Sequence, residues 1–325
     1  MKKPVVFCAV NKLAVSEEMF SLLNEKTELI YLDKKVSNNE LVDMIGDAEG
    51  LLMLGHRIDK RLLDAAPKLK AVSTLSVGFD SFDIEEMKRH GVVGLNTPDV
   101  LNDTVADLIV ALMFGVGRRI CELDNMVRQG QWKNRPFYMN FGHELSHKKL
   151  GIIGMGRIGE TLARKVIAGF NMKVSYFNRT RKKAVEEELG VNYLTKDDLL
   201  KDSEYIVVIA PLTEETRGMI GKREFSLMRN DAIFINAGRG PVVDENALIE
   251  SLQNKQIFGA GLDVFEKEPI SEDHPLTKIP NIILLPHIGS ITVECREAMA
   301  RVAVQGLIDY LNGKTPANLI PFFKE

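Results

Sequence analysis

The fold of this chain is decided by residues 150–166, which read LGIIGMGRIGETLARKV. An apolar run ends at Ile153, and a GxGxxG pattern follows at once from Gly154 to Gly159. The pattern opens a helical stretch that is predicted from Glu160 to Val166. This order of strand, glycine-rich turn and helix is typical of the first βα unit of a dinucleotide-binding Rossmann domain. The pattern alone is weakly specific, and the flanking strand and helix make it specific.

The three glycines of the pattern each answer a physical need. Gly154 allows the tight turn, Gly156 lets a pyrophosphate approach the backbone, and Gly159 lets the helix pack closely on the strand. The pyrophosphate binds at the helix N-terminus, where N–H groups and the helix dipole favour an anion. The pattern therefore predicts cofactor contacts from the whole turn, namely Gly154, Met155, Gly156, Arg157, Ile158 and Gly159.

The residue after the next predicted strand bears on which dinucleotide is bound. NAD-binding domains carry Asp or Glu about 20 residues after the fingerprint, where the carboxylate binds ribose hydroxyls. Here Asn178 occupies that place, and Arg179 and Thr180 follow it. A carboxylate would repel a 2′-phosphate, whereas asparagine and arginine can accept one. We therefore expect NADP(H) to be preferred over NAD(H), with contacts from Asn178, Arg179 and Thr180. The alternative is that Arg179, Arg181, Lys182 and Lys183 form only a solvated helix start.

Short apolar runs alternate with amphipathic stretches on both sides of this unit. Before it, strands are predicted at 5–9, 29–32, 50–54 and 71–74, with helices at 16–23, 38–46 and 60–66. After it, strands are predicted at 173–177, 205–209, 232–236 and 282–285. Alternation of this kind is typical of βαβ units, so the chain is predicted to be an α/β protein with doubly wound parallel sheets.

The length of 325 residues favours two domains, because single cores rarely grow beyond about 250–300 residues. The pattern changes near residues 96–99, and a long apolar helix follows at 100–118. The last helix, predicted at 292–311, is long enough to return to the first domain. We expect a flavodoxin-like substrate domain from 1–98 and 287–325, with a Rossmann cofactor domain inserted at 99–286.

The composition is that of a globular enzyme, with 45% hydrophobic and 27% charged residues. A net charge of -3 argues against nucleic acid or an anionic membrane as partner. No stretch approaches the roughly 18 apolar residues of a membrane span. The cysteines, Cys8, Cys121 and Cys295, lie far apart and form no CxxC pattern, which favours neither disulfides nor zinc. We expect a cytoplasmic protein without a metal site.

Three further segments each place a charged or titratable residue just after a predicted strand. Arg239 follows the strand at 232–236, Glu268 follows a short strand, and His287 follows the strand at 282–285. Ligands of open α/β sheets bind at the carboxyl ends of the strands, so these side chains are predicted to converge. Together they can bind a carboxylate, tune a histidine and transfer a proton.

With these motifs in order, nearly the whole sequence resembles the D-isomer-specific 2-hydroxyacid dehydrogenases, and among them the glyoxylate/hydroxypyruvate reductases. The family motifs are GIIGMGRIG at 151–159, FINAGRGPVVDE at 234–245, GLDVFEKEP at 261–269 and LPHIGS at 285–290. The closer match is carried by LSVGFD at 75–80 and NTPDVL at 96–101. Four ordered motifs are far more specific than any one of them.

The resemblance implies reduction of small 2-oxo acids such as glyoxylate or hydroxypyruvate to 2-hydroxy acids, D-configured where chiral. His287 is implied to be the general acid that protonates the carbonyl oxygen, and its ordinary pKa near 6.5 suits that task. Glu268 would hydrogen-bond the other ring nitrogen and raise the pKa of His287. Arg239 would grip the substrate carboxylate and carbonyl.

The same resemblance implies the remaining contacts. Val77 and Gly78 would donate backbone N–H groups to the substrate carboxylate, and Ser290 would bind a substrate hydroxyl. Further cofactor contacts are implied for Thr104, Ala210, Pro211, Thr216, Ala237, Gly238, Arg239, Asp263, His287 and Gly289. A helix-stabilising hydroxyl is the alternative for Thr104, and a buried structural carboxylate is the alternative for Asp263.

One segment departs from the mammalian-type reductases, which carry two tryptophans three residues apart. Here Trp132 is present, but Arg135 stands at the second place. Arg135 would favour a longer or more anionic oxo acid, and Trp132 would equally serve dimer packing. The resemblance also implies a homodimer, for which the apolar helix at 108–114 is suited, although burial in the core explains that face as well.

Other readings of these motifs stay open at this point. Within the family they are another 2-oxo acid reductase or a phosphite oxidiser. In a different class, a corepressor-like interaction protein would sense the dinucleotide without turning it over. Measurement of turnover separates an enzyme from such a sensor.

Overall fold

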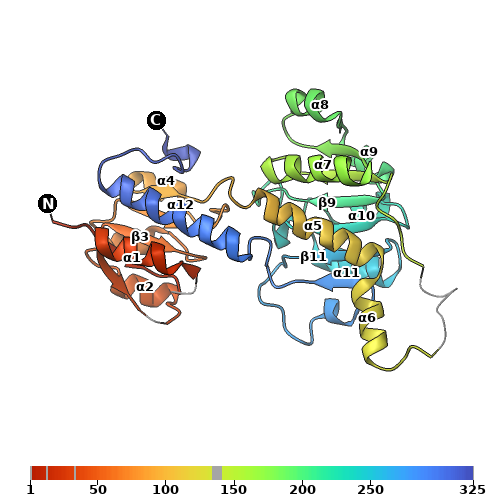
Figure 1. Cartoon of the computed structure of the whole chain (residues 1–325), viewed down its shortest axis with the longest axis horizontal. Helices are drawn as coiled ribbons and strands as arrows, with labels where there is room; N and C mark the ends of the chain where they lie inside the picture. The colour runs from red at the N-terminus through yellow and green to blue at the C-terminus, as the bar shows by residue number, and fades with distance from the viewer. Residues whose placement is uncertain (1, 12–13, 33, 134–140, 325) are drawn as a thin grey trace. The chain divides into compact units, whose positions relative to one another are not determined.

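The computed structural model describes residues 2–11, 14–32, 34–133 and 141–324. The chain divides into two compact units (Figure 1). We call Met1–Leu101 with Ile291–Glu325 the terminal unit, and Asn102–Ser290 the central unit. The divisions fall three and four residues after the boundaries expected at 98/99 and 286/287, so His287 and Ser290 belong to the central unit.

The terminal unit is built on a five-stranded parallel sheet with the order β2-β1-β3-β4-β5. Its strands are β1 (Val5–Cys8), β2 (Glu28–Tyr31), β3 (Gly50–Met53), β4 (Ala71–Thr74) and β5 (Val93–Leu95). This order is the flavodoxin-like one, which confirms the predicted fold of this part. All residues of β3 and β4 are buried, as expected for inner strands covered on both faces.

Helices cover both faces of this sheet. On one face, α1 (Glu17–Lys26) and α12 (Val293–Leu311) share a core with strand residues such as Val6 and Leu52. On the other face lie α2 (Asn38–Met44), α3 (Lys60–Ala65) and α4 (Ile84–Arg89). Each of these helices starts at a Ser, Thr or Asp whose side chain accepts a backbone N–H of the first turn.

The central unit is built on a seven-stranded parallel sheet with the order β12-β11-β10-β9-β6-β7-β8. Its strands are β6 (Lys149–Ile153), β7 (Lys173–Phe177), β8 (Asn192–Tyr193), β9 (Tyr205–Val208), β10 (Ile233–Asn236), β11 (Gly259–Leu262) and β12 (Ile282–Leu284). The strand order reverses between β6 and β9, as in a Rossmann fold, and dinucleotides bind at that switch point. The predicted fold class is confirmed.

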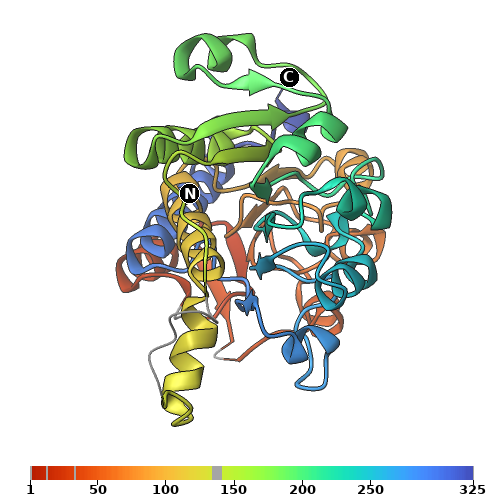
Figure 2. The same cartoon turned by 90° about the vertical axis from the view of Figure 1, so that its right-hand side faces the viewer.

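Two long helices, α5 (Asn102–Gly117) and α7 (Arg157–Phe170), lie side by side across one face of this sheet (Figures 1 and 2). The other face is covered by α9 (Lys196–Asp202), α10 (Lys222–Leu227) and α11 (Glu245–Gln253). α8 (Lys183–Leu189) precedes the edge strand β8. α6 (Ile120–Arg128) continues from α5 away from the sheet and has no buried side chain (Figure 2).

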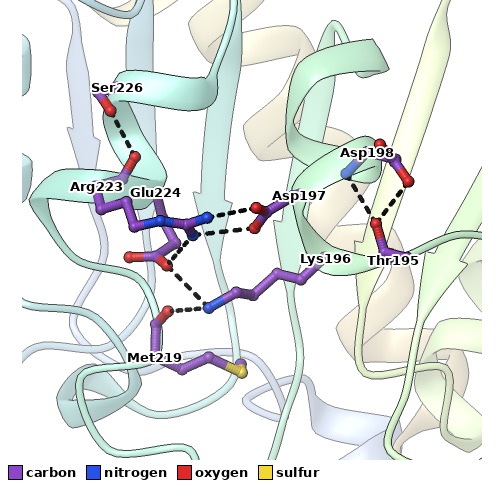
Figure 3. Close-up of polar contacts among 8 residues, drawn as sticks. All are labelled: Thr195, Lys196, Asp197, Asp198, Met219, Arg223, Glu224 and Ser226. Atoms are coloured by element: carbon purple, nitrogen blue, oxygen red, sulfur yellow. Dashed lines mark hydrogen bonds and ion pairs between the residues drawn. The ribbon is translucent and has the colours of Figure 1, made fainter.

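An ion-pair network joins α9 to α10 (Figure 3). Arg223 binds both carboxylate oxygens of Asp197, and Lys196 binds Glu224 at 3.0 Å. The Lys196 ammonium also donates to the carbonyl of Met219 at 3.1 Å. Met219 lies near the end of the loop between β9 and α10. The same loop contains Pro211 and Thr216. The network therefore fixes the far end of a loop to which cofactor contacts were assigned.

Candidate active site

The carboxyl ends of the central strands carry loops that pack backbone against backbone. A Cβ on Gly154 would lie 2.7 Å from the nitrogen of Ala210, and a Cβ on Gly238 would lie 2.9 Å from the carbonyl oxygen of Ala210. A Cβ on Gly240 would lie 1.8 Å from the carbonyl oxygen of Phe265. Glycine at these positions lets the loops after β6, β9, β10 and β11 converge at one edge of the sheet.

The glycine-rich turn after β6 fits the pyrophosphate of a dinucleotide. Gly154 has φ +108°, a conformation that favours glycine. Gly156 is the N-cap of α7 and has no side-chain cap, so the N–H groups of the first turn remain available to an anion. Among the described residues, no heavy atom lies within 4 Å of a Cβ built on Gly156, so a ligand can approach the backbone there.

Two of the cationic side chains in the segment after β7 form ion pairs with carboxylates of the same chain. Arg181 makes a two-pronged ion pair with Glu186, and Lys182 pairs with Glu160. Arg179 and Thr180 are exposed, and Arg179 makes no ion pair among the residues that the structure describes. Asn178 turns its side chain to the glycine-rich turn, where its Oδ1 accepts from the N–H of Met155 at 2.6 Å. Of the cationic side chains here, Arg179 is thus better placed for a ligand than Arg181 or Lys182.

His287 and Glu268 form a hydrogen-bonded pair at the ends of β12 and β11. The Nδ1 of His287 lies 2.8 Å from Oε2 of Glu268, and Oε1 of Glu268 accepts from the N–H of Phe265 at 3.0 Å. An ionised carboxylate can only accept, so Nδ1 carries the proton of this bond. Nε2 of His287 is then the ring nitrogen that can give a proton to a ligand.

The pair shifts the pKa values of both groups toward the charged forms. The hydrogen bond to Glu268 raises the pKa of His287 above its ordinary value, against burial and the charge of Arg239. Burial raises the pKa of Glu268, but the bonds from His287 and Phe265 outweigh it, and the net pKa is lowered. The resulting imidazolium–carboxylate pair is suited to donating a proton near neutral pH.

Arg239 completes the charged cluster from the loop after β10. Its positive charge is one of the smaller influences on the pKa values of Glu268 and His287, and it lowers both. The side chain is half-buried, and Nη1 donates to the carbonyl of Gly238 at 2.8 Å. A guanidinium held beside a proton donor can bind the carboxylate of a small acid.

Asp263, to which the resemblance assigned a cofactor contact, is a buried carboxylate that bonds the backbone beside His287, which is the structural alternative left open for it. The side chain is 2% exposed, and its two oxygens accept from the N–H groups of Ile288 at 2.7 Å and Gly289 at 2.8 Å. His287 itself has φ +55°, a left-handed conformation that non-glycine residues seldom adopt. The carboxylate therefore clamps the two residues that follow His287 and helps to hold the strained backbone.

An apolar cavity of about 380 Å³ adjoins the pair. Its lining consists of Phe265, Glu268, Pro269, Ile270, Leu284, Leu285, Pro286 and His287. Glu268 and His287 are the titratable residues of this lining, and their side chains stay partly open to solvent, at 36% and 49% exposed.

The other sequence-predicted residues lie at several places. Thr104 is in the first turn of α5, and the Thr216 hydroxyl donates to the carbonyl of Pro211 at 2.6 Å. Ala237 follows β10, while Gly289 and Ser290 end the central unit. The loop with Val77 and Gly78 follows β4 in the terminal unit, where the Val77 carbonyl accepts from Asn96 at 2.8 Å. Trp132 is 60% exposed, and Arg135 lies outside the described residues.

Two classes of feature bear on other functions. Among the described residues, no group of three or more His, Cys, Asp and Glu side chains could hold a metal ion. Within the same residues, no helix combines the length and the apolar character that crossing a bilayer requires.

Comparison with known proteins places this geometry in context. Residues 110–289 match the family model described as D-isomer specific 2-hydroxyacid dehydrogenase, NAD binding domain. The chain is 46% identical to glyoxylate/hydroxypyruvate reductase B of Klebsiella pneumoniae subsp. pneumoniae, over 86% of each chain. An NADPH-dependent glyoxylate/hydroxypyruvate reductase of Sinorhizobium meliloti, solved with NADP and malonate, superposes with a TM-score of 0.88 at 30% identity, covering 99% of this chain and 98% of the other. A glyoxylate reductase of Paecilomyes thermophila superposes with a TM-score of 0.89 at 26% identity over the full length of both chains.

Proposed function

The chain belongs to the D-isomer specific 2-hydroxyacid dehydrogenase family, and from that premise we propose that it is an NADPH-preferring reductase of glyoxylate and hydroxypyruvate. The products are 2-hydroxy acids, of the D configuration where they are chiral. The observation that carries the proposal is the 2.8 Å pair of His287 with Glu268, with the charge of Arg239 acting on both.

Each member of the cluster has one task in the reaction. When bound, the nicotinamide supplies the hydride that reaches the carbonyl carbon. Nε2 of His287 donates the proton to the carbonyl oxygen, and Glu268 stays ionised and holds Nδ1–H. Arg239 binds the substrate carboxylate and stabilises the charge that develops on the carbonyl oxygen. Ser290 is the proposed partner of the hydroxypyruvate hydroxyl. The carboxylate contacts expected for Val77 and Gly78, which lie in the terminal unit, stay a prediction from the sequence.

The glycine-rich turn and the segment after β7 are proposed to hold the dinucleotide. The pyrophosphate would lie on the open N-terminus of α7, and the 2′-phosphate would bind Arg179. Thr180, the loops with Ala210, Pro211 and Thr216, and the residues Thr104, Ala237, Gly238 and Gly289 are the proposed remaining contacts.

The direct test is the initial velocity with glyoxylate and with hydroxypyruvate, each with NADPH and with NADH. We expect kcat/KM to be higher with NADPH for both acids. Equal or higher values with NADH would refute the cofactor preference but leave the 2-oxo acid reductase standing. Absence of turnover with all four combinations would refute the proposed substrates.

Replacement of Arg179 with alanine is expected to weaken NADPH but not NADH. Loss of a hydrogen bond to a charged group costs about 1.5–3 kcal/mol, so kcat/KM with NADPH should fall roughly 10- to 100-fold. Lys183→Ala is the matched control, because it removes an exposed cation of the same segment to which no binding role is assigned. A loss with NADPH equal in the two variants would mean that only the general positive charge matters.

The pH profile should move when Glu268 is replaced with glutamine. Reduction needs protonated His287, whose raised pKa keeps the proton bound up to a higher pH than 6.5. Activity of the wild type is then lost as pH rises through that elevated pKa. In Glu268→Gln the negative charge is gone, so the alkaline limb of kcat/KM should shift to lower pH. An unshifted limb would show that another group controls it.

A homodimer is proposed to cover α6. In α5, the side chains of Ile109, Leu112 and Met113 are buried within the central unit, so its apolar face is mainly core. By contrast, Ile120 and Val127 on α6 are 52% and 48% exposed. Exposed apolar side chains on a projecting helix suit an interface with a second copy.

The double variant Ile120→Glu/Val127→Glu is therefore expected to sediment as a monomer at micromolar concentration, where the wild type sediments as a dimer. Gln129→Glu, at an exposed polar residue beside the same helix, should remain dimeric. A wild type that sediments only as a monomer would contradict the dimer.

A further inference from the structure

The side chain of Asn178 extends the hydrogen bonding between β6 and β7 beyond the point where their backbone pairing ends. β6 and β7 pair in parallel up to Ile153 and Phe177, and the N–H of Gly154 still donates to the carbonyl of Phe177 at 3.1 Å. With φ +108°, Gly154 then leaves the strand direction. Beyond it, no backbone bond joins Met155 to the end of β7 among the hydrogen bonds of the described residues.

The amide of Asn178 supplies the missing pair of bonds. Oδ1 accepts from the N–H of Met155 at 2.6 Å, and Nδ2 donates to the carbonyl of Met155 at 3.1 Å. A side-chain amide carries the same donor and acceptor as a peptide group, so it can replace one rung of the ladder. The two bonds also fix which end of the amide is oxygen, because only that assignment satisfies both partners.

An aspartate at this position could not make the same contacts. One carboxylate oxygen could accept from the N–H of Met155, but the other would face the carbonyl of Met155 at the 3.1 Å now spanned by Nδ2. Two acceptors at that distance repel each other, because neither has a proton to share. The asparagine is therefore matched to the turn itself, independently of any charge on a cofactor.

Met155, which both hydrogen bonds of the Asn178 amide hold, connects Asn178 to the proposed pyrophosphate site. Its side chain is fully buried, and it lies between Gly154 and Gly156, the N-cap of α7. The carbonyl of Asn178 is in turn held by the hydroxyl of Tyr193 at 3.3 Å. Asn178 thus ties the turn that would meet the pyrophosphate to the segment that begins with Arg179.

We propose that Asn178 is a positioning residue that holds the glycine-rich turn for the pyrophosphate, and that it leaves recognition of the 2′-phosphate to Arg179. This inference rests on the proposed dinucleotide site. It assigns the positioning of the turn to Asn178 and the binding of the 2′-phosphate to Arg179. The pyrophosphate is common to NADH and NADPH, so Asn178 supports both cofactors equally. Arg179 supports only the cofactor that carries the 2′-phosphate.

The test is the binding of three ligands to Asn178→Ala and Arg179→Ala in the full chain. Dissociation constants are measured by calorimetry, without substrate, for NADPH, NADH and adenosine 2′-monophosphate, which has a 2′-phosphate but no pyrophosphate. For Asn178→Ala we expect about tenfold weaker binding of both dinucleotides, from two lost hydrogen bonds, with their ratio unchanged. Binding of adenosine 2′-monophosphate should not change. For Arg179→Ala we expect the opposite, with NADPH and the monophosphate weakened and NADH unaffected.

Two further variants sharpen the result. Asn178→Asp keeps the size and shape of the side chain, but it should also weaken the binding of NADH, because a carboxylate cannot donate to the carbonyl of Met155. Asn230→Ala removes an exposed asparagine elsewhere in the central unit and should change none of the constants. Amide hydrogen exchange at Met155 should be faster in Asn178→Ala than in the wild type, because Oδ1 no longer protects that N–H.

The inference is overturned if Asn178→Ala lowers affinity for NADPH alone, weakens adenosine 2′-monophosphate, or changes no constant. If the proposed preference for NADPH is wrong, the binding constants change in a different way. In that case the wild type does not prefer NADPH and Arg179→Ala has no effect, while equal losses of both dinucleotides in Asn178→Ala would still support the positioning role.

Discussion

Replacement of His287 with asparagine is expected to lower kcat/KM for glyoxylate reduction by about 10²–10⁴-fold, the usual contribution of a positioned general acid. The structure gives Nδ1 to Glu268 and leaves Nε2 as the proton donor, and asparagine has no group with a comparable pKa. Asparagine is chosen because it tolerates the left-handed conformation at φ +55° better than other non-glycine residues. The loop, and with it the Asp263 clamp, should therefore persist.

The control for this variant is His90→Asn, at an exposed histidine that pairs with Asp64 in the terminal unit. It should keep the wild-type rate. Thermal unfolding followed by circular dichroism should give His287→Asn a midpoint near that of the wild type. If His287→Asn keeps more than a tenth of kcat/KM, His287 is not the proton donor.

Gly240→Ala is expected to disable the site through packing alone. The added Cβ would lie 1.8 Å from the carbonyl oxygen of Phe265 and 2.6 Å from the nitrogen of Glu266, both backbone atoms that cannot rotate away. The loops after β10 and β11 must therefore separate by more than about 1 Å, and they carry Arg239 and Glu268. A displacement of that size in a catalytic cluster can cost about 10²-fold in rate. Overpacking should also lower the free energy of unfolding by about 1–3 kcal/mol.

Gly169→Ala is the matched control for this prediction. Gly169 lies in α7, and a Cβ there meets no heavy atom of the described part of the chain within 4 Å. Alanine should raise the free energy of unfolding by up to about 1 kcal/mol and leave the rate unchanged. Urea unfolding and initial velocities test both variants. Activity of Gly240→Ala within threefold of the wild type would mean that the loops yield without moving Arg239 from Glu268.

Much of the fold could be read from periodicity. Runs such as 205–209 and 232–236 are apolar throughout because inner parallel strands are buried on both faces, and the structure contains β9 and β10 there. The strands missed were β5 and β8, with three and two residues. Runs that short carry no pattern that separates them from loops.

The sequence motifs predicted part of the candidate site. Arg239, Glu268 and His287 were predicted to converge because each follows a strand of one parallel sheet, and the structure brings their charges into one cluster. The same reasoning left open that Arg179, Arg181, Lys182 and Lys183 together form only a solvated helix start. It could not foresee that Arg181 pairs with Glu186, whereas Arg179 makes no ion pair among the described residues.

The sequence by itself determined the α/β class, the two parallel sheets, the glycine-rich turn and the types of residue at the strand ends. These features are local, since strand periodicity, turn chemistry and helix capping depend on neighbours a few residues away. Only the tertiary structure decided that Asn178 brackets Met155, that Asp263 clamps the residues after His287, and that Gly240 touches Phe265. Those contacts join residues about 25 positions apart through adjoining strands, so they depend on register and close packing, which no local pattern encodes.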